Sequence, residues 1–157
     1  MRICNTASCF VIDPRGRILL IKHAKLGMWL PPGGHVDESE MACYTAIRET
    51  REETGLDVKL IQKPPLVWNN TRMRSAAAPF ATTLHRADYG DNVHYHYNLC
   101  FMARVNGTKR VRPERNEVDD YGWFTIKEIL SMAGVPHDVK IIVSERIPET
   151  LLSRSRR

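Results

Sequence analysis

The sequence predicts a single domain of the α/β class. Its 157 residues are enough for one hydrophobic core and too few for two ordinary domains. Hydrophobic residues make up 43% of the chain and charged residues 26%, which is typical of a globular domain and excludes disordered, collagen-like and coiled-coil chains. Segments with strand character are mixed along the chain with segments of helix character. We therefore expect strands and helices around one core.

The chain begins with the pattern of a β-hairpin. Residues 3–12 and 17–23 are apolar and β-branched enough to form two strands. The four residues between them, Asp13-Pro14-Arg15-Gly16, have strong turn chemistry. The next segment, 31–34, reads Pro-Pro-Gly-Gly and cannot be helical.

A helix is expected from residue 39 to residue 54. Asp37 or Ser39 is the expected N-cap, and Gly55 suits the position just beyond the C-terminus. Further strands are expected at 57–62, 65–69, 93–105 and 119–124, and further helices at 126–133 and 137–147. Residues 70–92 have no clear periodicity and are predicted to be a long loop. Together these elements form one domain over 1–147, followed by a flexible basic tail over 148–157.

Charge is distributed unevenly along the chain. The whole chain carries +5, but residues 34–56 contain six acidic and only two basic residues, a net charge of −4. An acidic segment in a basic protein suits a metal site that also attracts a polyanionic substrate. The simpler alternative is that much of the positive excess belongs to the arginine-rich C-terminus.

The sequence predicts a cytoplasmic protein with reduced thiols. No segment reaches the ~18–20 uncharged apolar residues that a membrane-spanning helix needs, and charged residues interrupt the N-terminus before a signal-peptide core could form. The four cysteines include no Cys-x-x-Cys pair, which argues against a zinc site. We expect no membrane partner. The oligomeric state is left open, with a dimer as one option.

Three glutamates on the predicted helix 39–54 break the ordinary rules of helix stability. Glu49, Glu52 and Glu53 project within an arc of about 100°. Like charges at this spacing repel one another, and acidic residues in a last turn oppose the helix dipole. A divalent cation is the natural compensation, and hard carboxylate oxygens favour Mg²⁺, with Mn²⁺ as a substitute. The alternative is a solvated acidic helix end.

The same segment carries a longer spaced pattern. Gly34 is followed by Glu40, then by Arg48-Glu49-Thr50-x-Glu52-Glu53-x-Gly55-Leu56. This resembles the 23-residue signature of the Nudix (MutT-like) hydrolases at every fixed position. The one departure is Thr50, where the family usually has an aliphatic residue, and this affects packing more than chemistry.

The resemblance implies an α/β/α sandwich around a mixed sheet, with a catalytic loop–helix–loop. It implies Mg²⁺-dependent cleavage of a nucleoside diphosphate linked to another moiety, by attack of water on phosphorus. By position, the metal ligands are Glu49, Glu52 and Glu53, with the Gly33 carbonyl as a further one. Arg48 and Glu40 match a pair that braces the loop, and either Glu52 or Glu53 is the expected general base. A late acidic ligand is expected at Glu117, with Asp119 and Asp120 as alternatives.

The substrate is less well specified. His94 and His96 alternate along a predicted strand, so both face one side, where they could line the cleft or bind metal. Further candidate contacts are the base-stacking residue Trp29 and the cations Lys22 and Arg72. Markers of known Nudix subfamilies are mostly absent, so a nucleoside triphosphate or a related small nucleotide remains by elimination.

Two other functions are open at this stage. The chain could process the 5′ ends of nucleic acids, with the tail and the basic cluster in 109–115 as a phosphate track. It could also be a nucleotide-sensing module without turnover. The complete set of carboxylates favours an enzyme over a sensor.

Overall fold

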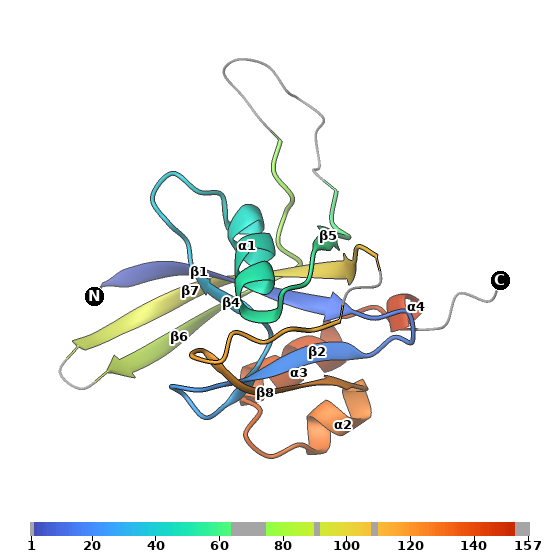
Figure 1. Cartoon of the computed structure of the whole chain (residues 1–157). Coiled ribbons are helices and arrows are strands. Elements are labelled where there is room, and N and C mark those ends of the chain that lie inside the picture. Colours follow the sequence, from blue (N-terminus) through green and yellow to red (C-terminus); the bar gives the residue numbers. More distant parts are fainter. Residues whose placement is uncertain (1, 64–74, 90–91, 108–109, 153–157) are drawn as a thin grey trace.

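The computed structural model describes residues 2–63, 75–89, 92–107 and 110–152 (Figure 1). In these residues eight strands form one mixed sheet: β1 (Ile3–Ile12), β2 (Ile18–His23), β3 (Trp29–Leu30), β4 (Gly33–His35), β5 (Val58–Leu60), β6 (Ala81–Tyr89), β7 (Asn92–Val105) and β8 (Val118–Phe124). The described helices are α1 (Ala42–Thr54), α2 (Ile126–Ser131), α3 (His137–Glu145) and α4 (Glu149–Leu152). None of them has the length and apolar character to span a bilayer.

Strand β1 is the centre of the sheet. It runs parallel to β7, with Ile3 opposite Tyr95 and Ile12 opposite Arg104. It pairs antiparallel with β2 next to the hairpin turn and with β4 over residues 6–8. Strand β7 also pairs with β5 and β6. Segments far apart in the sequence are thus joined around one strand.

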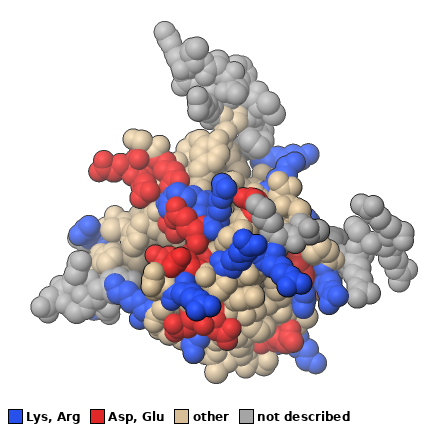
Figure 2. Space-filling model, in the orientation of Figure 1, with Lys and Arg blue, Asp and Glu red and all other residues tan. Residues whose placement is uncertain are grey.

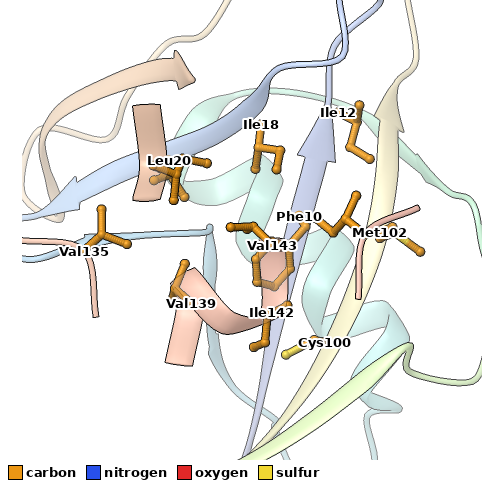
Figure 3. Packing of buried hydrophobic residues seen from close by; sticks show 12 residues of the cluster. Phe10, Ile12, Ile18, Leu20, Cys100, Met102, Val135, Val139, Ile142 and Val143 are labelled. Atoms are coloured by element: carbon orange, nitrogen blue, oxygen red, sulfur yellow. The ribbon is translucent and has the colours of Figure 1, made fainter. Parts of the chain in front are cut away.

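The sheet separates two hydrophobic cores. Alternate residues of a strand face opposite sides, so Phe10 packs on one face and Cys9 on the other. The Phe10 face is covered by α3 and α2 and contains the side chains shown in Figure 3, including Ile18, Leu20, Cys100, Met102, Val139, Ile142 and Val143. The Cys9 face is covered by α1 and contains Val11, Leu19, Cys43, Ala46, Leu56 and Phe101. This arrangement confirms the predicted α/β/α sandwich.

The hairpin has the predicted turn. The Asp13 carboxylate accepts hydrogen bonds from the backbone N–H groups of Arg15 and Arg17 at 2.9 and 2.8 Å. The Arg17 guanidinium also pairs with it at 2.7 Å. Gly16 adopts a positive φ of 77°, which a residue without Cβ reaches at little cost.

Helix α1 begins later than predicted. Its N-cap is Met41, which makes no side-chain capping bond, and neither Asp37 nor Ser39 caps it. The backbone at Ser39 is left-handed, with φ 67°, so the chain is still turning there. The other end agrees with the prediction, because Gly55 is in the left-handed region and its N–H donates to the Arg51 carbonyl.

The predicted loop over 70–92 was partly wrong, because it contains strand β6. Along residues 81–87 exposed side chains alternate with half-buried ones, so β6 has no fully buried face and lacks an apolar signal. The short strands β3 and β4 were also missed, since two or three residues give no periodicity. The strand predicted at 65–69 lies outside the described residues.

The C-terminal helices match the prediction to within a few residues. Thr125 caps α2 and forms a reciprocal capping box with Glu128. Within the predicted tail, residues 149–152 form α4, and the side chains of Leu151 and Leu152 pack against the core. Residues 153–157 lie outside the described part.

Candidate active site

Glu53 is a buried carboxylic acid at the end of α1. It is 2% exposed, and its Oε2 atom accepts a hydrogen bond from the Gly33 N–H at 2.9 Å. Burial is the main reason that its pKa is raised to about 8, and the negative charges of Glu49, Glu117 and Glu52 contribute to the rise. The Gly33 N–H acts in the opposite direction. Without a cation nearby, this side chain is therefore mostly protonated at neutral pH.

Glu49 lies one turn earlier on the same side of α1. Its side chain is 15% exposed, and burial is the main reason that its pKa is raised, while the Arg48 guanidinium lowers it. The Glu49 carboxylate can occupy this place only because residue 34 is glycine: a Cβ atom there would lie 2.5 Å from Glu49 Cδ. The pair Gly33-Gly34 thus lies against the buried carboxyl group of Glu53 and the half-buried one of Glu49.

Arg48 connects the acidic residues to one another. Its guanidinium binds both oxygens of Glu40, at 3.1 and 2.9 Å, and its Nη1 atom pairs with Glu49 at 2.8 Å and Glu52 at 3.0 Å. Its Nη2 atom also donates to the His35 carbonyl at 3.3 Å. The same pairing lowers the pKa of Glu40, whose carboxylate also accepts a hydrogen bond from Thr45 at 2.7 Å. Arg48 and Glu40 therefore contact each other directly, and their bracing role remains a prediction.

The remaining acidic candidates are exposed. The Glu52 side chain is 54% exposed and reaches the cluster through Arg48. Glu117 is exposed but close enough for its charge to raise the pKa of both Glu49 and Glu53. Its segment is held against α1, because the Glu114 N–H donates to the Glu53 carbonyl at 3.0 Å. Asp119 and Asp120 lie further along, as exposed residues of β8. Figure 2 shows acidic and basic side chains side by side on the α1 face.

A cavity of about 450 Å³ opens on the opposite face of the sheet, beside α3. Gly33, Gly34 and His35 form part of its wall, so the cavity and the carboxylates meet at the two glycines. Polar groups in the wall include Thr6 and Ser8, whose hydroxyls both donate to Asn98 Oδ1. The apolar part includes Phe10, Leu30, Val139 and Ile142.

Histidines gather at one end of this cavity. His35, His85 and His96 line it, and the Nε2 atom of His96 lies 2.9 Å from that of the buried His94. Burial and, to a smaller extent, the neighbouring histidines lower the pKa of His96 to about 4, so the ring is neutral at pH 7. His85 instead pairs with Asp138 at 3.2 Å and holds the pKa of that acid below its usual range. His94 and His96 thus share one side of a strand, as predicted.

The other predicted substrate contacts lie elsewhere. Lys22 is paired in the sheet opposite Asp120, and Trp29 packs edge-to-face against Phe124 with ring centroids 5.4 Å apart. Neither belongs to the described lining of the cavity. Arg72 lies outside the described residues. Their substrate contacts remain predictions.

Several residues at the site were not predicted from the sequence. Thr6, Ser8 and Asn98 form polar parts of the cavity wall. His35 also lines the cavity, and its carbonyl accepts a hydrogen bond from Arg48, which pairs with the carboxylates. Thr6 and Ser8 could have been found from the sequence, because polar side chains at alternate positions of an otherwise apolar strand indicate a face that is not packed in a core. His35 left none.

The two glycines should respond differently to alanine. In Gly34→Ala the new Cβ atom meets the end of the Glu49 side chain, which can move, so we expect a large loss of activity with little change in melting temperature. In Gly33→Ala it would lie 2.3 Å from the Ala7 carbonyl oxygen, a backbone atom, so the melting temperature should fall. Thermal unfolding and kcat of both variants test this. Equal losses of stability would contradict the separate surroundings of the two positions.

Comparisons with known proteins identify the family of this chain. The NUDIX domain family matches residues 3–143. The chain is 30% identical over 134 residues to the NAD-capped RNA hydrolase NudC of Chromobacterium violaceum, covering 83% of this chain and 41% of that protein. It is 62% identical over 29 residues to the asymmetrical bis(5′-nucleosyl)-tetraphosphatase of Mus musculus, covering 18% of this chain and 20% of that protein.

A solved structure matches nearly the whole fold. The chain is similar to a NUDIX family hydrolase from Clostridium perfringens, with a TM-score of 0.76, 23% identity, and coverage of 93% of this chain and 97% of that chain. The two curated relatives are longer than their matched parts, and the chain spans no more than about two fifths of their length. The family match covers most of the chain. The chain therefore belongs to the Nudix hydrolase family.

Proposed function

We propose that this protein is a Mg²⁺-dependent pyrophosphohydrolase that cleaves a nucleoside diphosphate linked to another moiety. The observation that carries the proposal is the meeting of the α1 carboxylates with the cavity at Gly33-Gly34. A nucleotide in the cavity could extend its diphosphate past the glycines toward Glu49, Glu52 and Glu53. The reacting phosphorus would then lie beside the acidic residues.

The carboxylates suit a divalent cation. Glu53 is buried near three other acids, and the pKa values of Glu53 and Glu49 are both raised although Arg48 pairs with Glu49, so the protein compensates their negative charge only in part. Arg48 donates a hydrogen bond to one oxygen of Glu49 and to one oxygen of Glu52. The second oxygen of each carboxylate would then bind the ion. Oxygen ligands of this type favour Mg²⁺ or Mn²⁺. Glu49, Glu52 and Glu53 would hold the ion, with the Gly33 carbonyl and Glu117 as further ligands.

Each residue then has a defined task. A bound Mg²⁺ supplies charge neutralisation of the diphosphate and a water of lowered pKa. Glu52 or Glu53, in the last turn of α1, would accept the proton of the attacking water. Arg48 and Glu40 would orient Glu49 and Glu52 through their hydrogen bonds. The buried surroundings of Glu53 would limit access of bulk water.

The substrate is proposed to be a small nucleotide, such as a nucleoside triphosphate. A second candidate is the 5′ end of an RNA, because the long match to NudC concerns a protein named for hydrolysis of NAD-capped RNA. Both substrates contain a nucleoside diphosphate linked to another group. A screen that includes nucleoside triphosphates, dinucleoside polyphosphates and capped RNA, scored by the phosphate-containing products, distinguishes them.

Turnover should depend fully on a divalent cation. Excess chelator should abolish hydrolysis, and Mg²⁺ or Mn²⁺ should restore it, because the negative charge at α1 has to be offset before a diphosphate can approach. The melting temperature should rise with Mg²⁺ concentration, since the ion binds the folded state. Undiminished hydrolysis in chelator would overturn the proposal.

A further inference from the structure

A second group of metal-binding side chains lies at the end of the sheet where β1 begins. One ligand atom from each of Cys4, His35 and His94 lies within 4.8 Å of the other two. In the part of the chain that the structure describes, this is the one set of three such side chains that meets this spacing. The α1 glutamates are therefore not the most compact potential ligand group.

Strand register brings the three residues together. Cys4 is opposite His96 in the parallel pair of β1 and β7, and Thr6 is opposite His35 in the antiparallel pair of β1 and β4. Residues two apart on a strand share a face. Cys4, His35 and His94 therefore all project from the face that carries the cavity, although they come from three strands.

The histidine rings are held in place by one another. The Nε2 atoms of His94 and His96 are 2.9 Å apart, and the rings of His35 and His96 meet edge-to-face with centroids 4.8 Å apart. His94 is buried, Cys4 is half-buried and His35 is exposed, so the group has a fixed inner side and an open outer side. An ion could enter from solvent without unfolding the strands.

The ligand types distinguish this group from the α1 carboxylates. One thiol and two imidazoles are ligands that Zn²⁺ prefers, whereas Mg²⁺ prefers oxygen. In a tetrahedral zinc site with bonds of ~2.0–2.3 Å, the ligand atoms lie ~3.3–3.7 Å from one another. The ligand atoms of Cys4, His35 and His94 lie within 4.8 Å, so they need to approach one another by roughly 1 Å to bind the ion. All four cysteines of the chain are free thiols, so Cys4 is not held in a disulfide.

We propose that Cys4, His35 and His94 form a zinc-binding site that is separate from the Mg²⁺ site. The site links β1, β4 and β7. Because His35 directly follows Gly34 and its carbonyl accepts a hydrogen bond from Arg48, a bound zinc ion holds the strand that contacts Glu49 and Glu53. The absence of a Cys-x-x-Cys pair does not argue against this site, since one cysteine and two histidines on three strands leave no linear motif.

The test uses the whole chain in saturating Mg²⁺, so that the α1 carboxylates are occupied. Co²⁺ is titrated first, because a cobalt–thiolate charge-transfer band reports a cysteine ligand directly, and Zn²⁺ is then used to displace it. We expect the band in wild type and its loss in Cys4→Ser. Zinc affinity should fall at least ~100-fold in Cys4→Ser and in His35→Ala, since even supporting residues of metal sites cost up to that factor.

Matched controls make the outcome specific. Cys43→Ala changes a cysteine of α1 on the other face of the sheet, and His137→Ala changes an exposed histidine at the start of α3. Both should keep wild-type zinc affinity, and so should Glu53→Gln. A missing band in wild type, a band that persists in Cys4→Ser, or a loss of zinc binding in Glu53→Gln would overturn the proposal. The band does not depend on turnover, so it is independent of the proposed hydrolase activity.

Discussion

Glu53→Gln is expected to lower kcat by ~10²–10⁴-fold while the metal-free protein melts no lower than wild type. The variant keeps the size of the side chain and an oxygen that can accept the Gly33 N–H, but it loses the charge that would bind the ion or take the proton. In the folded protein without metal, that charge is unfavourable, because Glu53 is buried beside Glu49. Activity and stability should therefore change in opposite directions.

The stability difference should grow with pH. An unperturbed glutamate has a pKa of 4.5, and the buried Glu53 has a pKa of about 8. Between these values the folded state binds more protons than the unfolded state, so the metal-free wild type loses stability as the pH rises. Glutamine does not titrate, so the stability of the metal-free variant relative to metal-free wild type should increase with pH up to about pH 8.

Measurement of the metal-free melting temperature and of kcat on the same preparations tests this prediction. Glu145→Gln, at the exposed end of α3, is a matched control that should change neither quantity. If kcat of Glu53→Gln stayed within about threefold, below the range for loss of a general base, Glu53 would not be central to the chemistry. A much lower metal-free melting temperature would mean that the carboxylate is structural.

Arg48→Ala and Glu40→Gln are expected to be strongly coupled. Two hydrogen bonds of 2.9 and 3.1 Å join the guanidinium to the carboxylate, and both side chains are mostly shielded from water. Such a charged, two-point pair should give a coupling free energy of ~1–3 kcal/mol in a double-mutant cycle. Arg48→Ala should lose more activity than Glu40→Gln, because it also releases Glu49 and Glu52.

Urea unfolding of wild type, both single variants and the double variant provides the cycle. The matched control is the pair of Arg51 and Asp57, which is 3.5 Å apart and has an arginine side chain that is 71% exposed. Its cycle of Arg51→Ala and Asp57→Asn should give a coupling below ~1 kcal/mol. If both cycles gave the same small coupling, Arg48 and Glu40 would not brace the loop.

The acidic half of the site could be predicted from the sequence because it is local. Glu49, Glu52 and Glu53 lie on one helix, where a spacing of three or four residues determines the shared face. The partner in the loop, Glu40, followed from its place in the Nudix signature. The start of α1 could not be predicted, since Glu40 bonds with Arg48 and Thr45, and the backbone at Ser39 turns into the left-handed region.

Apart from His96, the residues of the cavity could not be predicted, because their position depends on strand register. His96 faces Cys4 only because β7 pairs with β1 in one particular alignment, and a shift of one residue would turn its side chain to the other face of the sheet. Strand β6 was hidden for a related reason: an edge strand that is only half buried carries little apolar signal. Residues such as Asn98 therefore had no pattern that linked them to the glycines.

The parallel pairing of β1 with β7 also has a consequence for biosynthesis. Ile3 pairs with Tyr95, and Ile12 with Arg104. The central strand β1 can therefore pair with β7 only after about ninety further residues have been synthesised. Closing so long a loop is entropically costly and slows folding relative to a chain built from local contacts. During translation, the hairpin and α1 emerge first, while one edge of β1 stays unpaired and prone to association until β7 leaves the ribosome.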